Sequence, residues 1–155
     1  MNVEYMGNKA LLGREMTAFL APSHVSPLAV LPTLDWASEM SRSGRPVVSG
    51  FTSRLEKEVW SVLARNHSPM VAVLVRSKYK QIPARYLPLL ESGVLLLVFL
   101  GLGTHLSRKL AARRNDYVAS LASHIVFPSV TASSMLFPLY QGLACEQKDV
   151  KLLVE

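Results

Sequence analysis

Short apolar runs alternate with amphipathic stretches along the chain, and glycine, proline, serine or charged residues separate them. Apolar runs of this kind are typical of strands buried on both faces, and the amphipathic stretches have helical periodicity. The pattern predicts strands at 16–23, 45–51, 69–77, 93–100 and 124–130, with 149–155 as a sixth, edge strand. Helices are expected between them, at 26–44, 53–65, 82–93, 107–123 and 133–144.

Local signals mark the ends of the first two helices. Ser26 is a candidate N-cap, and a helix tolerates Pro32 only near its start, so the first helix begins late or kinks. Gly44 falls where a glycine commonly ends a helix. Ser53 and Glu56 fit the Ser-x-x-Glu capping box of the second helix, which accounts for most of the role of Glu56.

Strands that alternate with helices imply right-handed crossovers and a mostly parallel sheet with helices on both faces. The predicted fold class is therefore α/β, a doubly wound, Rossmann-like sheet in a single domain. A length of 155 residues suits one domain of this kind. We assign residues 1–15 to a short helical or irregular lead-in segment and residues 16–155 to the domain itself.

Several other classes of protein are excluded by composition. The longest apolar run, 93–103, is about half of the ~20 residues that span a bilayer, so we expect a buried strand and no membrane partner. The first residues lack the apolar core of a secretory signal. Cys145 is the only cysteine and the four histidines are scattered, so no disulfide framework or metal site is expected. These features favour a cytoplasmic location.

The positive charge of the chain is concentrated in its central part. Residues 76–114 carry a net charge of +7, whereas the rest of the chain carries −1. The eight cations are Arg76, Lys78, Lys80, Arg85, Arg108, Lys109, Arg113 and Arg114. Most of them follow the third and fourth predicted strands, and ligands of doubly wound sheets bind beyond the carboxyl ends of strands. The distribution predicts an anionic partner at that edge.

The stretch "RPVVSGFTSRLEKEVW" reads as a strand, a Ser-Gly turn and an amphipathic helix. Ser49 and Thr52 would lie beside the exposed amides of a helix N-terminus, a combination that suits a phosphate. Gly50 would allow either a tight turn or the close approach of a ligand.

The chain resembles a known family through four of its segments. These are "PVVSGFTSRLEKEVW", "MVAVLV", "ESGVLLLVF" and "ARRNDYVASLASHIVFPSVTASS". Together they are similar to the Rossmann domain of the DNA-processing protein A (Smf) family, over roughly residues 17–144. The resemblance implies a short member of a wider superfamily of nucleotide-sensing Rossmann domains that includes the lysine-decarboxylase-like proteins.

Individual positions follow the family pattern. Ser49 and Gly50 match its Ser-Gly turn, and Arg114 and Asn115 match the first two residues of its Arg-Asn-Arg motif. Ser133 and Ser134 stand where the family has a small Ser-Gly turn after the fifth strand.

Other positions depart from the family. The Gly-x-Arg after the first strand is replaced by "APSHVSP", the family histidine by Trp60, and the third residue of Arg-Asn-Arg by Asp116. The C-terminal winged-helix domain has no counterpart, which weakens the expectation of single-stranded DNA loading. The Pro-Gly-Gly-x-Gly-Thr signature of the phosphoribohydrolase relatives is absent, which argues against that activity.

We therefore expect a non-catalytic binding module for a nucleotide-like or phosphorylated small anion at the carboxyl edge of the sheet. The candidate ligand-binding residues are Ser23, Ser49, Gly50, Thr52, Arg113, Arg114, Asn115, Ser133 and Ser134.

Two alternatives remain open from the sequence. One is a single-stranded DNA-binding protein in DNA uptake or recombination. The other is an enzyme that cleaves a nucleotide or nucleoside, with Glu56 or Asp116 as the acid-base group. The sequence assigns no cofactor, and it leaves open the oligomeric state, a homo-oligomer included.

Overall fold

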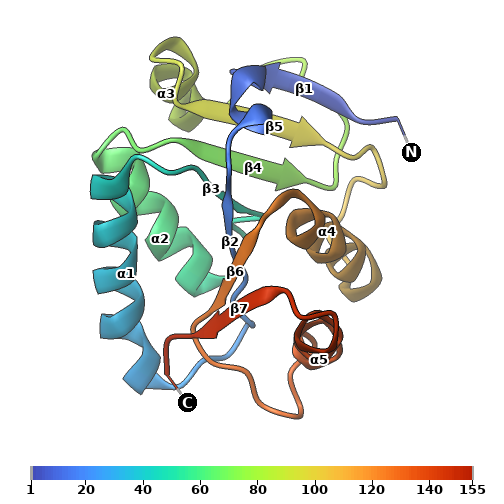
Figure 1. Ribbon diagram of the computed structural model, residues 1–155. Helices are drawn as coiled ribbons and strands as arrows, with labels where there is room; N and C mark the ends of the chain where they lie inside the picture. The colour runs from blue at the N-terminus through green and yellow to red at the C-terminus, as the bar shows by residue number, and fades with distance from the viewer. Residues whose placement is uncertain (1, 155) are drawn as a thin grey trace.

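The computed structural model describes residues 2–154 and contains a seven-stranded sheet between two layers of helices (Figure 1). The strands lie in the order β1-β5-β4-β3-β2-β6-β7, and all neighbours are parallel except β1, which runs antiparallel to β5. Their bounds are β1 Glu4–Gly7, β2 Thr17–Phe19, β3 Val47–Ser49, β4 Met70–Leu74, β5 Leu95–Phe99, β6 His124–Phe127 and β7 Asp149–Leu152. The α-helices are α1 Val30–Ser43, α2 Arg54–Arg65, α3 Leu87–Glu91, α4 Arg108–Leu121 and α5 Phe137–Cys145. The doubly wound, Rossmann-like sheet predicted from the sequence is confirmed.

The expectation of a helical or irregular lead-in was wrong for its first part. Glu4–Gly7 forms β1, and Lys9–Gly13 then forms a short 3-10 helix. β1 is only half-buried and has charged or polar neighbours, so its own sequence carries little strand signal. Its conformation comes from β5, whose free edge supplies the hydrogen-bonding partner.

The core consists of two apolar layers, one on each face of the sheet. Along β5, Leu95, Leu97 and Phe99 face the layer under α1, α2 and α3, and Leu96 and Val98 face the layer under α4 and α5. All five side chains are fully buried. The apolar run is therefore a central strand, as predicted. Within residues 2–154, none of the helices has the length and apolar character needed to cross a bilayer.

The start of the first helix agrees with the sequence signals. Ser26 caps a short 3-10 turn, Pro27–Ala29, by accepting a hydrogen bond from the Leu28 amide at 3.2 Å. The α-helix begins only at Val30, so Pro32 lies in its first turn, where a missing amide proton costs nothing. Gly44 ends the helix in the left-handed conformation, with φ of 72°.

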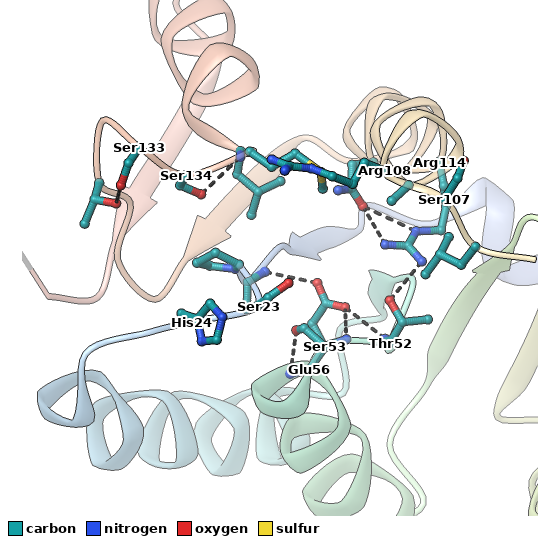
Figure 2. A pocket seen from close by; sticks show the side chains of 18 residues that line it. Ser23, His24, Thr52, Ser53, Glu56, Ser107, Arg108, Arg114, Ser133 and Ser134 are labelled. Carbon is teal, nitrogen blue, oxygen red and sulfur yellow. Dashed lines mark hydrogen bonds between the residues drawn. The ribbon is translucent and has the colours of Figure 1, made fainter.

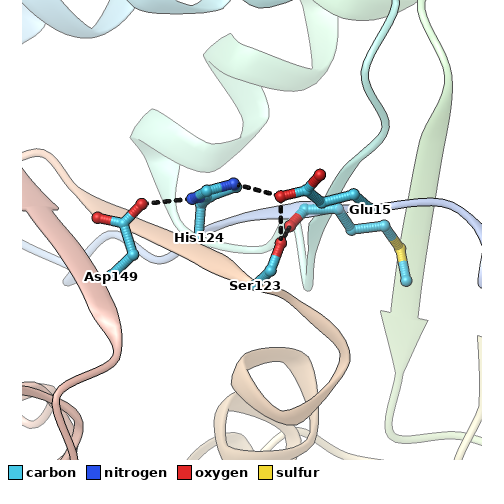
Figure 3. A network of polar contacts seen from close by, with 5 residues as sticks. Glu15, Ser123, His124 and Asp149 are labelled. Carbon is cyan, nitrogen blue, oxygen red and sulfur yellow. Dashed lines mark hydrogen bonds and ion pairs between the residues drawn. The ribbon is translucent and has the colours of Figure 1, made fainter.

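A polar network joins three segments at the amino ends of the strands (Figure 3). Nε2 of His124 lies 2.7 Å from a carboxylate oxygen of Glu15, and Nδ1 contacts the carboxylate of Asp149. His124 opens β6 and Asp149 opens β7, and the two residues are paired in the ladder. The ring of His124 therefore links the lead-in segment to the edge strand.

Candidate functional site

A cavity of about 540 Å³ lies at the carboxyl ends of β2, β3 and β6 (Figure 2). Strands β3, β4 and β5 extend the sheet on one side of β2, and β6 and β7 extend it on the other. The strand order therefore reverses between β2 and β6, the place where doubly wound sheets bind their ligands. Residues from four segments, 21–24, 52–56, 106–115 and 131–136, line the cavity.

Glu56 holds the β2 and β3 loops together beneath this cavity. Its carboxylate is 2% exposed, and one oxygen accepts the amides of Thr52 and Ser53 at 2.9 and 3.1 Å. The other oxygen accepts the amide of Ala21 at 3.0 Å. Ser53 in turn accepts the amide of Glu56, which completes the predicted capping box. Glu56 therefore does more than cap α2, because it also fixes the loop that follows β2.

These contacts correct the expectation that the Ser-Gly turn presents its amides to a phosphate. The amides of Thr52 and Ser53 already donate to Glu56, and the amide of Phe51 donates to Oγ of Ser49 at 3.1 Å. A carboxylate of the protein itself occupies the N-terminus of α2. The three amides of this turn are therefore engaged inside the chain, and Ser49 lies fully buried under the loop.

Arg114 projects from the second turn of α4 toward the same loop. Its Nη1 donates to Oγ1 of Thr52 at 2.9 Å, and Nε and Nη2 donate to Oδ1 of Asn115 at 3.3 and 3.1 Å. The side chain is 4% exposed, yet within residues 2–154 no carboxylate lies within 4.0 Å of the guanidinium. Burial lowers the pKa of Arg114, and the charge of Glu56 acts in the opposite direction. Buried cations are normally paired with a carboxylate, and within residues 2–154 Arg114 has only neutral oxygen acceptors instead.

Gly50 is required by Arg114 rather than by the turn. Its φ is not in the left-handed region, and the strained residue of the turn is Phe51, with φ of 52°. A Cβ at Gly50 would lie 2.4 Å from Nε and 2.5 Å from Cζ of Arg114. The missing side chain thus leaves the space in which the guanidinium lies.

The N-termini of α2 and α4 both line the cavity, but only that of α4 has free amides. Ser107 caps this helix by accepting the amide of Leu110 at 3.1 Å, and Ser107, Arg108 and Ala111 all line the cavity. The amides of Arg108 and Lys109 donate to no group in the described part of the chain. A helix N-terminus with free amides carries partial positive charge. It adds to the positive potential of Arg108 and Arg114.

The structure brings six of the nine candidate residues together at the cavity. These are Ser23, Thr52, Arg114, Asn115, Ser133 and Ser134. Ser49 and Gly50 lie beneath it, and Arg113 is exposed and does not line it. Sequence reasoning missed Ser107 as a lining residue and did not select Arg108 or His24 as site residues. The serine before the basic helix is the signal that could have located the α4 N-terminus.

The eight central cations converge on the site only in part. Arg108 and Arg114 line the cavity, but Arg76 stacks over the ring of Tyr79, 3.8 Å from its centroid. Arg85 lies 4.5 Å from the centroid of Tyr86, which is 5% exposed and packs against Trp60. Tyr86 is therefore a core residue and offers no free face to a nucleobase.

The sequence matches no family model and no curated protein at a significant level. The fold, in contrast, matches solved structures. DNA processing protein A (DprA) from Streptococcus pneumoniae superimposes with a TM-score of 0.75 and 17% sequence identity, over 96% of this chain and 53% of that protein. The protein of the same name from Helicobacter pylori gives a TM-score of 0.71 and 16% identity, over 96% of this chain and 69% of that one.

The chain has the fold of DNA processing protein A. The resemblance inferred from the sequence is therefore confirmed at the level of the fold. The chain spans about half the length of the S. pneumoniae DNA processing protein A. The H. pylori DNA processing protein A binds single-stranded DNA.

Proposed function

We propose that this chain is a non-catalytic binding module whose cavity takes a nucleotide-like, phosphorylated ligand. The observation that carries the proposal is the buried guanidinium of Arg114, which lines the cavity without a carboxylate partner in residues 2–154. Leaving a buried charge uncompensated costs several kcal/mol, on the order of 3–5 kcal/mol when a partner is removed. A phosphate that enters the cavity would supply both the missing charge and strong, charge-assisted acceptors.

Other groups at the cavity suit the same ligand. The N-terminus of α4 provides free amides, and Arg108 adds a second, exposed cation. Ser23 on the loop after β2, and Ser133 and Ser134 on the loop after β6, add hydroxyl groups to the cavity lining (Figure 2). These groups donate hydrogen bonds to phosphate or ribose oxygens, as in other anion sites at helix N-termini.

The hydrogen bonds of Glu56 favour binding over cleavage. A general base needs a carboxylate oxygen that is free to accept a proton from the substrate or water. Both oxygens of Glu56 instead accept backbone amides that fix the loops. Asp116, the other acid considered, is exposed and does not line this cavity.

Single-stranded DNA is the second candidate ligand. The fold shared with a DNA-binding protein favours it, and so do the exposed cations Arg76, Lys78 and Lys80, which follow β4 at the same edge of the sheet. In this case the cavity would hold one nucleotide of the strand, and the protein would act in DNA uptake or recombination.

Isothermal titration calorimetry with mononucleotides tests the first proposal. We expect Arg114→Gln to abolish binding and Arg113→Gln to leave it unchanged, because these neighbours change the net charge equally but only Arg114 lines the cavity. Far-UV circular dichroism checks that both variants are folded. Equal binding by the two variants would contradict the proposal.

The salt dependence of oligonucleotide binding separates the two ligands. Each phosphate neutralised on a single strand contributes about −0.7 to the slope of log affinity against log salt. We expect a slope of about −1 for a single phosphate site. A slope of about −4 would indicate roughly six phosphate contacts and would support single-stranded DNA as the ligand.

A further inference from the structure

A second cavity, of about 420 Å³, lies between α4 and α5 beside the first one. Its walls are mostly apolar and include Leu139, Leu143 and Pro138, whereas Asp116 and Glu146 are its two acids. Asn115, Met135 and Leu136 line both cavities, so the two share a wall. An apolar cavity with a few polar groups is the usual form of a small-molecule site.

Asn115 presents a free hydrogen-bond donor at this shared wall. Its Oδ1 accepts two hydrogen bonds from Arg114, which fixes the orientation of the amide. Its Nδ2 donates to no group in residues 2–154, although the residue is only 4% exposed. Nδ2 is not among the fully buried polar atoms without a partner, so it contacts solvent and can donate to an acceptor on a ligand that enters the cavity.

We propose that the second cavity is a subsite for a guanine base, with Asp116 as the principal acceptor. The proposal rests on the proposed function, because the phosphate of the same nucleotide would pair with Arg114. Arg114, Asn115 and Asp116 are consecutive on α4, so one helical turn reaches from the phosphate cavity to the base cavity.

The chemistry of the groups selects guanine among the bases. A carboxylate accepts hydrogen bonds and cannot donate them, and its two oxygens suit two adjacent N–H donors. Guanine offers such a pair, N1–H and N2–H₂, next to the acceptor O6. The Asn115 amide would donate to O6 while Asp116 accepts from N1 and N2.

The other bases fit this donor and acceptor pattern less well. Adenine and cytosine each place one amino group beside an acceptor nitrogen, which a carboxylate repels. Thymine and uracil place one N–H between two carbonyl oxygens. The apolar side chains of α5 would cover the flat face of any base, so they would add affinity but would not discriminate between the bases.

Calorimetric titration with 5′-GMP, 5′-AMP and 5′-IMP tests the inference, because IMP differs from GMP only by the 2-amino group. A bidentate contact discriminates bases by roughly tenfold or more, so we expect GMP to bind at least ~10-fold tighter than AMP, with IMP between them. Asp116→Asn should reduce the preference for GMP to less than about threefold. Glu58→Gln, an exposed acid of α2 outside both cavities, is the matched control and should keep it.

The outcomes distinguish this inference from the function on which it rests. Equal affinity for GMP and AMP, lost in Arg114→Gln, would overturn the guanine subsite and leave the phosphate site standing. A preference for GMP that persists in the double variant Asp116→Asn/Glu146→Gln would overturn the assignment to this cavity. Failure of all three nucleotides to bind would overturn both proposals.

Discussion

Replacement of Gly50 by alanine tests whether the absence of a side chain at this position makes room for the guanidinium of Arg114. The new Cβ would lie 2.4 Å from Nε and 2.9 Å from Cδ of Arg114. An ordinary contact is about 3.5 Å, so the side chain must move by about 1 Å. A shift of that size lengthens the 2.9 Å hydrogen bond to Thr52 beyond the limit of such bonds. The substitution should therefore displace the guanidinium from the cavity floor.

The same geometry gives the expected loss in the free energy of unfolding of Gly50→Ala. Overpacking a filled site costs about 1–3 kcal/mol, and we expect about 2 kcal/mol here. For a domain of this size, about 2–4 °C is lost per kcal/mol, so the Tm should fall by roughly 4–8 °C. Gly13→Ala is the control, because nothing lies within 4 Å of the Cβ position at Gly13. Differential scanning calorimetry measures the Tm of both variants.

A double-mutant cycle tests whether the loss of stability in Gly50→Ala comes from the contact with Arg114. In an Arg114→Ala background the space beside Gly50 is empty, so adding Gly50→Ala should cost less than about 0.5 kcal/mol. The same loss of Tm in both backgrounds would show that the turn itself requires glycine. An unchanged Tm and unchanged ligand affinity in Gly50→Ala alone would refute the contact with Arg114.

Three further predictions concern the groups around the site and the edge strand. Arg114→Met should leave the ligand-free protein as stable as the wild type or more stable, because it removes a buried charge that no carboxylate of residues 2–154 contacts, and urea unfolding checks this. Glu56→Gln should cost about 1–3 kcal/mol, because it replaces an acceptor of backbone amides, whereas the exposed Glu58→Gln should cost less than about 0.5 kcal/mol in the same assay. Hydrogen bonds to Asp149 and Glu15 raise the pKa of His124, so its stabilising contribution is complete below about pH 6.5 and disappears as the pH rises through the folded-state value. Urea unfolding at pH 6 and pH 8 should show a smaller change in His124→Gln than in the wild type, and identical changes would contradict the network of Figure 3.

The sheet could be predicted because its strands carry their own signal. Leu95–Phe99 and Met70–Leu74 are continuous apolar runs, and burial on both faces is the only arrangement that suits them. β1 lacked such a signal, because its conformation depends on pairing with β5. Local sequence alone therefore cannot predict β1, because the prediction requires knowing that the outer edge of β5 is free to pair.

The sequence selected six residues that line one cavity, but it did not predict the hydrogen bonds that hold the cavity together. Topology and charge located it at the carboxyl edge, and the family resemblance selected Arg114 and Asn115. Nothing in "RKLAARRND" distinguishes the buried Arg114 from the exposed Arg113, because burial depends on the opposing β3 loop. In the same way, the sequence of the Ser-Gly turn could not show that Glu56 accepts the amides of Thr52 and Ser53, so that the free N-terminal amides at the cavity are those of α4.

A crystal structure of the protein with a bound 5′-nucleotide tests the central claim most directly. We predict a phosphate oxygen about 2.7–2.9 Å from the Nη atoms of Arg114 and beside the N-terminal amides of α4. The base should lie between α4 and α5. A phosphate bound at the N-terminus of α2, or at exposed cations away from Arg114, would contradict the claim.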